Sequence, residues 1–462
     1  MSRIAHPAGP RHGDVLPADY PPAPPADLNA LHPGIWPRGA WRSGGVLMLG
    51  GMDVRDLAAE FGTPLYVCDE QDVRSRCRDY LEALGPGDRV CYAAKAFCCR
   101  AMLRWVSSEG LGVDVCTGGE LEVALAAGVP PENIALHGNN KTVDELSRAL
   151  SAGVGDIVVD SFEEIARLAY LTEESAARPN VLVRVTTGVE AHTHEFMATA
   201  HDDQKFGFSL ASGAAEEAVR RVIASPGLSF AGLHSHIGSQ IFDTAGFEVA
   251  AQRVVGLAVR IRDEHGIEIA DLDLGGGFGI AYTEEDKPPE VMELARRLGA
   301  IVDGQCQAAG LARPRLTVEP GRTIVGPSTV TLYTVGTIKD VDGLRTYVSV
   351  DGGMSDNIRT ALYDASYACA LASRASSAPP VLCRVVGKHC ESGDIVVRHA
   401  YLPSDLAPGD LLAVAATGAY CREMASNYNH VPRPAVVAVS AGTARTIVRR
   451  ESIDDLLRLD VG

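Results

Sequence analysis

Between residues 90 and 318 the sequence repeats one pattern: a short apolar run typical of a β-strand, then an amphipathic stretch long enough for a helix. Repeated strand–helix units indicate a parallel sheet with helices packed outside it. The eight runs are Val90–Ala93, Gly112–Val115, Asn133–Leu136, Asp156–Val159, Val181–Val185, Phe230–Leu233, Asp271–Leu274 and Leu316–Val318. Eight units in about 250 residues match a closed (β/α)8 barrel. We predict this fold, with an open doubly wound sheet as the alternative.

The pattern changes after residue 320. Strand-like runs separated by turn residues follow, with few helical patterns between them, and they predict a mostly antiparallel β domain over residues 321–462. We place the barrel at 71–320 and expect residues 41–70 to join the β domain. Residues 1–40 hold nine of the 26 prolines and show no apolar periodicity, which predicts a flexible proline-rich arm.

Charge and composition narrow the class of protein. Acidic residues outnumber basic ones by 59 to 42, which disfavours nucleic acid as a partner. No run approaches the roughly 20 apolar residues of a membrane span, and the N-terminus shows no apolar segment of a secretory signal. The 11 cysteines are scattered rather than arranged as a disulfide framework. We therefore expect a cytoplasmic enzyme.

In a barrel of this kind, chemistry takes place at the carboxyl ends of the strands. Lys95 follows the first strand directly. Burial would lower its pKa and leave a neutral amine able to attack an aldehyde. The alternative is a surface lysine that happens to follow a strand.

Other strand ends carry groups that suit a phosphorylated cofactor. Gly275–Gly277 follow the seventh strand and could cradle a phosphate with backbone N–H groups, with Ser239 as a hydroxyl donor. A tight turn is the alternative. Glu319 would keep a pyridine nitrogen protonated, and His236 could cover the face of the same ring. The alternative for Glu319 is an ion pair with Arg322. An amine, a phosphate cradle and a carboxylate together point to pyridoxal phosphate.

Six motifs in order then make the chain recognisable. They are Tyr92–Ala96, His234–Gln240, Asp273–Gly277, Glu319–Arg322, Cys390–Asp394 and Gly418–Tyr420. From about residue 41 to 462 the chain resembles the pyridoxal-phosphate decarboxylases built on the alanine-racemase-like barrel, and within them the diaminopimelate decarboxylases. The resemblance implies decarboxylation of meso-2,6-diaminopimelate to L-lysine and CO2, the last step of lysine biosynthesis, with pyridoxal 5'-phosphate as the cofactor.

The resemblance also implies roles for individual residues. Lys95 would form the internal Schiff base, and His236 would stack on the pyridine ring. Residues implied to hold the cofactor, besides these two, are Ser239, Gly277, Glu319, Pro320, Gly321, Arg322 and Tyr420.

For the substrate, the resemblance implies that arginines bind the distal carboxylate and Glu391 the distal ammonium. Residues implied to contact the substrate are Arg322, Arg359, Tyr363, Glu391 and Tyr420. Cys390 would be the proton donor. In this family the residues matching Cys390 and Glu391 reach the active site of the other subunit, so a homodimer with shared active sites is implied.

Several alternatives stay open. Arg359 and Tyr363 could be packing residues on one helix face, and Cys390 an inert buried thiol. The chain could be another decarboxylase of the group, acting on arginine or ornithine. The basic distal end of those substrates would be bound better by an acidic pocket than by two arginines. A racemase would favour an arginine at the ring nitrogen. A metal-dependent hydrolase could use the pairs His192 with His194 and His234 with His236, but we expect no metal.

Overall fold

The computed structural model describes residues 23–173, 178–189, 205–341 and 345–462. Contacts within the chain divide it into two compact units. The barrel unit consists of Asp69–Ser328 and Gly418–Glu423, and the β unit consists of Met1–Cys68, Thr329–Thr417 and Met424–Gly462.

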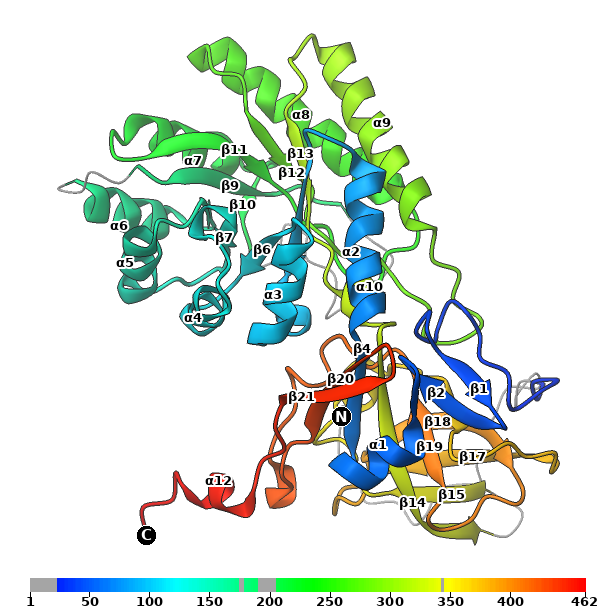
Figure 1. The fold of residues 1–462 in the computed structure, drawn as a ribbon. Helices are drawn as coiled ribbons and strands as arrows, with labels where there is room; N and C mark the ends of the chain where they lie inside the picture. Colours follow the sequence, from blue (N-terminus) through cyan, green and yellow to red (C-terminus); the bar gives the residue numbers. More distant parts are fainter. Residues whose placement is uncertain (1–22, 174–177, 190–204, 342–344) are drawn as a thin grey trace, which may run out of the picture. The chain divides into compact units, whose positions relative to one another are not determined.

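The barrel unit is a closed ring of eight parallel strands (Figure 1). In ring order the strands are β5 (Arg89–Ala93), β6 (Gly112–Val115), β7 (Ile134–Leu136), β8 (Asp156–Val159), β9 (Asn180–Thr186), β11 (Ser229–His234), β12 (Asp271–Asp273) and β13 (Arg315–Val318). Pairing of β13 with β5 and of β8 with β9 leaves no open edge, and a short strand, β10 (Phe208–Ser209), adds to β9. The (β/α)8 barrel is thus confirmed, and the open sheet is excluded.

Helices precede, connect and follow the barrel strands and pack outside the ring (Figure 1). They are α2 (Glu70–Leu84), α3 (Arg100–Ser108), α4 (Gly118–Ala127), α5 (Val143–Ala152), α6 (Phe162–Thr172), α7 (Ala214–Ala224), α8 (Ala245–His265), α9 (Val291–Ala309) and the short α10 (Arg322–Val325). Local sequence sets many of their ends. Thr142 begins α5 with a capping box, and Gly153 ends it in the left-handed region. Short, well-defined connections of this kind fix where each strand-end loop begins.

The β unit is built on a nine-stranded mixed sheet. Its strands are β4 (Leu65–Asp69), β14 (Thr329–Val341), β15 (Arg345–Val350), β16 (Cys369–Leu371), β17 (Pro380–Val386), β18 (Ile395–Pro403), β19 (Leu411–Val414), β20 (Ala435–Ser440) and β21 (Thr443–Val448). β15 and β17 pair in parallel, whereas β14 pairs antiparallel with β4, β15 and β19, β16 with β19, β17 with β18 and β20 with β21, so the mostly antiparallel prediction is confirmed. Smaller elements complete the unit: β1 (Trp41–Ser43), β2 (Val46–Leu49), β3 (Met52–Asp53), α1 (Val54–Phe61), α11 (Arg359–Tyr363) and α12 (Ile453–Leu457).

Two segments differ from the expected organisation. The proline-rich arm was expected to be flexible as far as residue 40, yet Ile35 and Trp36 are buried and Asn29 bonds the carbonyl of Ser376. Two large apolar side chains with a buried position explain why this stretch packs onto the β unit. The segment Gly418–Glu423, expected in the β domain, belongs to the barrel unit.

Where the structure describes the chain, no helix is long and apolar enough to cross a membrane.

A buried carboxylate in the β unit is titratable in the neutral pH range. Asp356 accepts a hydrogen bond from the Gly353 N–H at 2.7 Å and another from the Tyr333 hydroxyl. Burial raises the pKa of Asp356 to about 7, although both bonds oppose the rise. The folded chain therefore keeps this proton up to about pH 7, whereas an unfolded chain releases it near pH 4. Native stability is lost as the pH rises through this interval.

We expect Asp356→Asn, which imitates the protonated acid, to stabilise the protein more at pH 8 than at pH 5. One pKa unit corresponds to about 1.4 kcal/mol, so the gain at pH 8 should be on the order of 1 kcal/mol or more. Thermal unfolding at the two pH values measures it, with the exposed Asp454→Asn as control. Equal effects of Asp356→Asn at both pH values would contradict the assignment.

Candidate active site

Lys95 lies at the carboxyl end of the first barrel strand. It is the middle residue of a single 3-10 turn, η2 (Ala94–Ala96), directly after β5. Its side chain is 43% exposed, and its Nζ lies 3.8 Å from Oδ2 of the buried Asp114 on β6. The ammonium group is therefore accessible at the mouth of the barrel and has an acidic neighbour.

The charge state of Lys95 differs from the sequence expectation. Partial desolvation at the barrel mouth lowers the pKa of Lys95, but Asp114 and Cys116 oppose this, and the net effect is a raised pKa. The expected neutral amine is thus wrong for the chain as it stands. The sequence could not show this, because Asp114 reaches Lys95 only through the pairing of β5 with β6.

Glu319, which follows β13, is the buried carboxylate at the centre of the strand ends. Its Oε1 lies 2.8 Å from Nε2 of His137, and its Oε2 lies 3.5 Å from Nε2 of His234. His137 also approaches Oδ1 of Asp114 at 3.6 Å. A row of groups with alternating charge therefore runs from Lys95 through Asp114 and His137 to Glu319.

The pKa values of this row follow from the contacts. Burial alone would raise the pKa of Glu319, but His137 outweighs it and holds the value well below the usual range. Burial opposes the charge on His137, yet Asp114 and Glu319 leave its pKa raised. Burial lowers the pKa of His234 to about 4, so this ring is neutral. The site presents an ionised carboxylate against two imidazoles, of which that of His137 is favoured in its charged form and that of His234 is neutral.

The glycine loop after β12 has no space for side chains. A Cβ on Gly276 would lie 2.2 Å from the carbonyl oxygen of Glu319, and one on Gly277 would lie 2.1 Å from that of Gly238. Gly275 and Gly277 also have positive φ, at 69° and 96°. Asp273 fixes the start of the loop by accepting from the Gly275 N–H at 2.7 Å. The loop backbone can therefore approach a ligand closely.

His236 lies beside this loop, two residues beyond the end of β11. Its Nδ1 accepts from the N–H of Gly276 at 3.2 Å, so the lone pair of that nitrogen is committed to the loop. Burial and the positive charge of Lys95 lower the pKa of His236 well below its usual value. A neutral, oriented ring of this kind can stack on a flat ligand.

Arg322 contacts two further predicted residues, Ser239 and Tyr420, and one that was not predicted, Tyr282. It is buried and donates to Oγ of Ser239 at 2.8 Å and to the hydroxyl of Tyr282. Its guanidinium lies 4.7 Å from the ring centre of Tyr420. The backbone N–H of Tyr420 donates to the Ala96 carbonyl at 2.8 Å, which holds Tyr420 next to η2.

Pro320 and Gly321 pack the segment that follows β13 against the end of β5. The Pro320 carbonyl accepts from the Ala93 N–H at 3.2 Å. A Cβ on Gly321 would lie 2.9 Å from the Ala93 carbonyl oxygen. These contacts place Glu319 and Lys95 at one edge of the barrel.

The remaining four predicted residues belong to the β unit. Arg359 and Tyr363 are the first and last residues of α11, and the buried Arg359 guanidinium donates to the hydroxyl of Tyr367. Cys390 and Glu391 are exposed on the loop between β17 and β18. The buried thiol considered for Cys390 is therefore excluded.

The sequence predicted no role for Asp114, His137, Asp273 or Tyr282, and it suggested His234 only as a possible metal ligand. Asp114, His137, His234 and Asp273 are polar residues at strand ends, and that position is the signal by which they could have been found. Tyr282 carries no such signal because it lies in a loop.

A metal site is not supported by the predicted histidine pairs. His234 approaches Glu319, whereas His236 is bound to the glycine loop. His192 and His194 lie outside the described residues. His137, His234 and Glu319 bring one ligand atom each within 4.8 Å of one another, a spacing that could also hold a metal ion.

The residues fit pyridoxal phosphate. The Oε1 atom of Glu319 lies 2.8 Å from Nε2 of His137, but this contact lacks hydrogen-bond geometry, and among the described residues the oxygen accepts no hydrogen bond. The ionised carboxylate can therefore accept one from a protonated ring nitrogen. The loop of Gly275–Gly277, free of side chains, suits a phosphate, and Lys95 supplies an accessible amine.

Comparison with known proteins identifies the family. Residues 70–326 match the family model of the pyridoxal-dependent decarboxylase, pyridoxal binding domain. The chain is 60% identical over 444 residues to the diaminopimelate decarboxylase of Mycobacterium bovis, covering 94% of this chain and 99% of that one. That of Mycobacterium leprae is 58% identical over 468 residues and covers 99% of both chains. The chain belongs to the diaminopimelate decarboxylases.

A solved structure of this family supports the fold assignment. Diaminopimelate decarboxylase from M. jannaschii in complex with L-lysine matches with a TM-score of 0.86 at 32% identity, covering 92% of this chain and 98% of that one. The cofactor of this family of decarboxylases is pyridoxal phosphate, as its domain name states.

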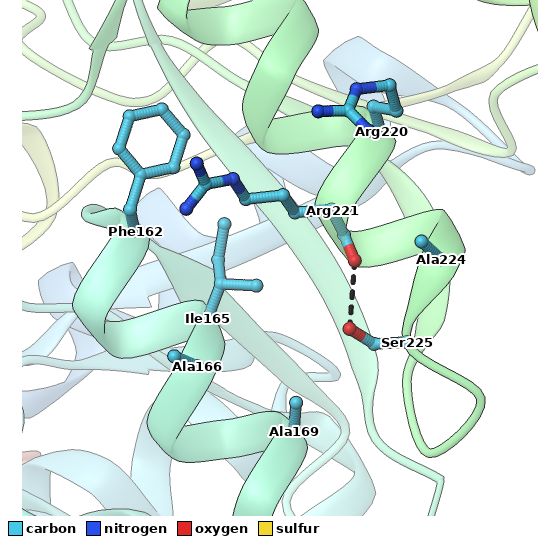
Figure 2. A pocket seen from close by; sticks show the side chains of 8 residues that line it. All are labelled: Phe162, Ile165, Ala166, Ala169, Arg220, Arg221, Ala224 and Ser225. Carbon is cyan, nitrogen blue, oxygen red and sulfur yellow. Dashed lines mark hydrogen bonds between the residues drawn. The ribbon is translucent and has the colours of Figure 1, made fainter.

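One hollow lies apart from the groups expected to act in a diaminopimelate decarboxylase. It measures about 280 Å3 and lies between α6 and α7, where Arg221 extends over Phe162 (Figure 2). Its lining residues belong to α6, to α7 and to Ser225, and none of them is a residue expected to act in catalysis. The strand ends therefore remain the candidate active site of the barrel unit.

We expect Gly276→Ala to weaken cofactor binding by about 10-fold or more, because the new methyl group would displace the backbone beside Glu319. Titration of the apoprotein with pyridoxal phosphate, followed by absorbance, measures the affinity. Gly299→Ala is the matched control, since a Cβ there meets nothing within 4 Å and the helix should gain stability. Unchanged affinity in Gly276→Ala would contradict the glycine cradle.

Proposed function

We propose that this chain catalyses the pyridoxal-phosphate-dependent decarboxylation of meso-2,6-diaminopimelate to L-lysine and CO2, the last step of lysine biosynthesis. The observation that carries the proposal is an ionised buried carboxylate, Glu319, at the same barrel end as the accessible amine of Lys95. The names of its relatives and the lysine bound to a solved member of the family support the substrate.

Residues of the barrel unit would hold the cofactor. Lys95 supplies the amine for covalent attachment, and His236 offers a neutral ring face. The phosphate would lie at Gly277 and Ser239, while Glu319 accepts the ring N–H. When bound, pyridoxal phosphate supplies a sink for the electron pair left by the departing carboxylate. Pro320 and Gly321 keep Glu319 in place, and Tyr420 is held beside η2.

Charged residues would recognise the two ends of the substrate. Arg322 and Arg359 suit the distal carboxylate, and Glu391 suits the distal ammonium. Tyr363 and Tyr420 would complete the substrate contacts. A second carboxylate at the distal end distinguishes this substrate from free ornithine or arginine. The basic distal ends of those two amino acids would be repelled by the side chains of Arg322 and Arg359.

Proton transfer completes the reaction. The bond between the α-carbon and its carboxylate would break and CO2 would leave, with the electron pair of that bond remaining on the substrate side. The thiol of Cys390 then gives its proton to that carbon, and water reprotonates the thiolate. An exposed cysteine can approach a substrate, whereas a buried one could not.

We further propose that the protein acts in the cytoplasm as a homodimer with shared active sites. Two observations support this. None of the 11 cysteines, all within the described residues, forms a disulfide. Cys390 and Glu391 are exposed on the β unit, where a second subunit could use them. Sedimentation of the holoenzyme measures the oligomeric state.

The direct test of the reaction is an assay with meso-diaminopimelate. We expect equal amounts of CO2 and L-lysine from the purified holoenzyme, and little CO2 from ornithine or arginine. Release of CO2 from ornithine or arginine but not from diaminopimelate would keep the cofactor chemistry and overturn the substrate. No CO2 from any of them would overturn the reaction class.

We expect Lys95→Ala to abolish covalent attachment of pyridoxal phosphate, because no other amine in the site is proposed for it. Reduction with borohydride followed by peptide mass spectrometry should find the cofactor on Lys95 in the wild type and not in the variant. Lys339→Ala, on the exposed part of β14, is the control. Label on another lysine of the wild type would contradict the role of Lys95.

A further inference from the structure

A buried polar cluster lies beneath the loop that carries Cys390. The loop runs from Lys388 to Gly393 in the β unit, between β17 and β18. Cys390 and Glu391 are exposed on it, whereas Ser355, His389 and Asp394 are at most 8% exposed. The reaction described above uses none of the three buried side chains.

Asp394 fixes the two ends of this loop. Its Oδ2 accepts from the His389 N–H at 2.7 Å, and its Oδ1 accepts from the Met354 N–H at 2.6 Å. Gly353 and Gly387 make room for the carboxylate, since a Cβ at either would lie within 2.4 Å of one of its oxygens. The backbone before Cys390 is thereby anchored to the segment that follows β15.

A second anchor reaches Cys390 itself. The N–H of Cys390 donates to Oδ1 of Asn429 at 3.2 Å, and Nδ1 of His389 lies 3.2 Å from the same oxygen. Because the backbone N–H can only donate, the atom that it faces must be the amide oxygen of Asn429. Two donors therefore converge on one acceptor.

This arrangement also sets the tautomer of His389. The amide oxygen of Asn429 accepts only, so Nδ1 carries the proton. In the neutral ring, Nε2 then accepts from the hydroxyl of Ser355 at 2.8 Å. Ser355 is 3% exposed and so is not a nucleophile for an outside substrate, although serine and histidine are in contact. The cluster orients the loop rather than performing separate chemistry.

Asn429 is held in a conformation that suits this task. It lies in η5 (Tyr428–His430) with φ 51° and ψ 27°, a left-handed geometry that asparagine tolerates better than most residues. The ring of the neighbouring Tyr428 lies 5.4 Å from that of His389. Two segments far apart in sequence are thus joined at the backbone of Cys390.

We propose that Asn429, oriented by His389, is a positioning residue for the Cys390 thiol. It acts by fixing the backbone from which the proton donor projects. The inference rests on the proposed function, in which Cys390 protonates the carbon that has lost CO2. A misplacement of about 1 Å in a reacting group can cost roughly 100-fold in rate, so one lost anchor should be measurable.

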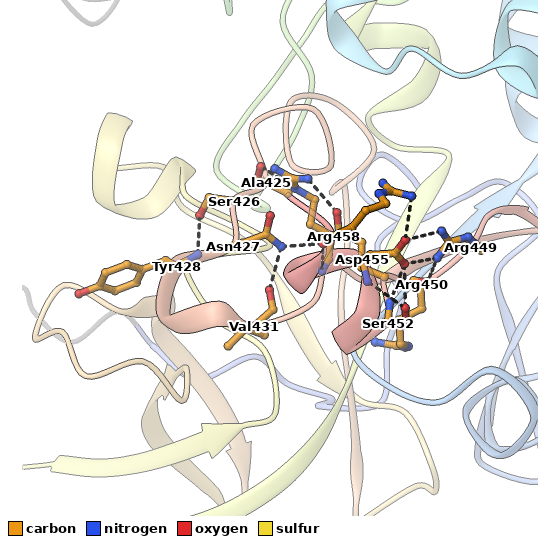
Figure 3. A network of polar contacts seen from close by, with 12 residues as sticks. Ala425, Ser426, Asn427, Tyr428, Val431, Arg449, Arg450, Ser452, Asp455 and Arg458 are labelled. Atoms are coloured by element: carbon orange, nitrogen blue, oxygen red, sulfur yellow. Dashed lines mark hydrogen bonds and ion pairs between the residues drawn. The ribbon is translucent and has the colours of Figure 1, made fainter. Parts of the chain in front are cut away.

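The test compares three variants of the full-length holoenzyme. Asn429→Ala removes the acceptor, and Asn429→Asp retains an oxygen in the same place. Asn427→Ala is the matched control. The side-chain amide of Asn427 bonds the Val431 carbonyl at 3.2 Å (Figure 3) and Glu451 at 2.6 Å, and among the described residues no bond joins it to the Cys390 loop.

Three measurements are made on each variant. Hydrogen exchange of the peptide containing residues 388–393 reports the anchor without need of activity. Steady-state kinetics separates kcat from KM. Turnover in D2O, analysed by NMR of the lysine ε-carbon, reports whether deuterium enters on one face only, which a general loss of stability would not change.

In Asn429→Ala we expect faster exchange in this peptide, a fall in kcat of about 10-fold or more with a smaller change in KM, and mixed deuterium configuration. Asn429→Asp should restore a single configuration, and Asn427→Ala should match the wild type. A single configuration and wild-type kcat in Asn429→Ala would overturn the inference, as would equal losses in Asn427→Ala. Absence of lysine from the wild type would instead overturn the proposed function, and this inference with it.

Discussion

The proposed active site depends on keeping one buried carboxylate ionised. Glu319 is 4% exposed, and burial of this degree would by itself favour the neutral acid. The closed ring counteracts the effect of burial, because it brings Nε2 of His137, at the end of β7, to within 2.8 Å of the Glu319 carboxylate beyond β13. In an open sheet these two strand ends would not face each other. The barrel is therefore a requirement of the electrostatics and not merely a support for them.

The other groups at the strand ends also depend on the closed ring of strands. Asp114 links the charge of His137 to that of Lys95, and the glycine loop leaves space where a ligand must approach the backbone. Arg322 is held by Ser239 and Tyr282, so its charge is presented in a fixed orientation. The proposed proton donor belongs to the β unit, where a separate polar cluster fixes its backbone. Cofactor binding and proton delivery are thus assigned to different parts of the chain.

Much of this could be predicted from sequence because it is local. All eight barrel strands were visible as apolar runs, and Lys95, Glu319 and the glycine loop were marked by their place after those runs. The raised pKa of Lys95 and the contacts of His137 could not be predicted, since they arise between side chains from neighbouring or opposite strands. The same is true of Gly418–Glu423, whose membership of the barrel unit has no local signal. The motif carrying Cys390 was recognisable, but its anchor on Asn429 depends on tertiary contact.

The central claim is that an ionised Glu319 keeps the ring nitrogen of the cofactor protonated. Nitrogen-15 NMR of the holoenzyme, reconstituted with pyridoxal phosphate labelled at the ring nitrogen, tests it most directly. We expect the chemical shift of a protonated pyridine in the wild type and that of an unprotonated one in Glu319→Gln, with cofactor still bound in both. An unprotonated ring nitrogen in the wild type would contradict the account.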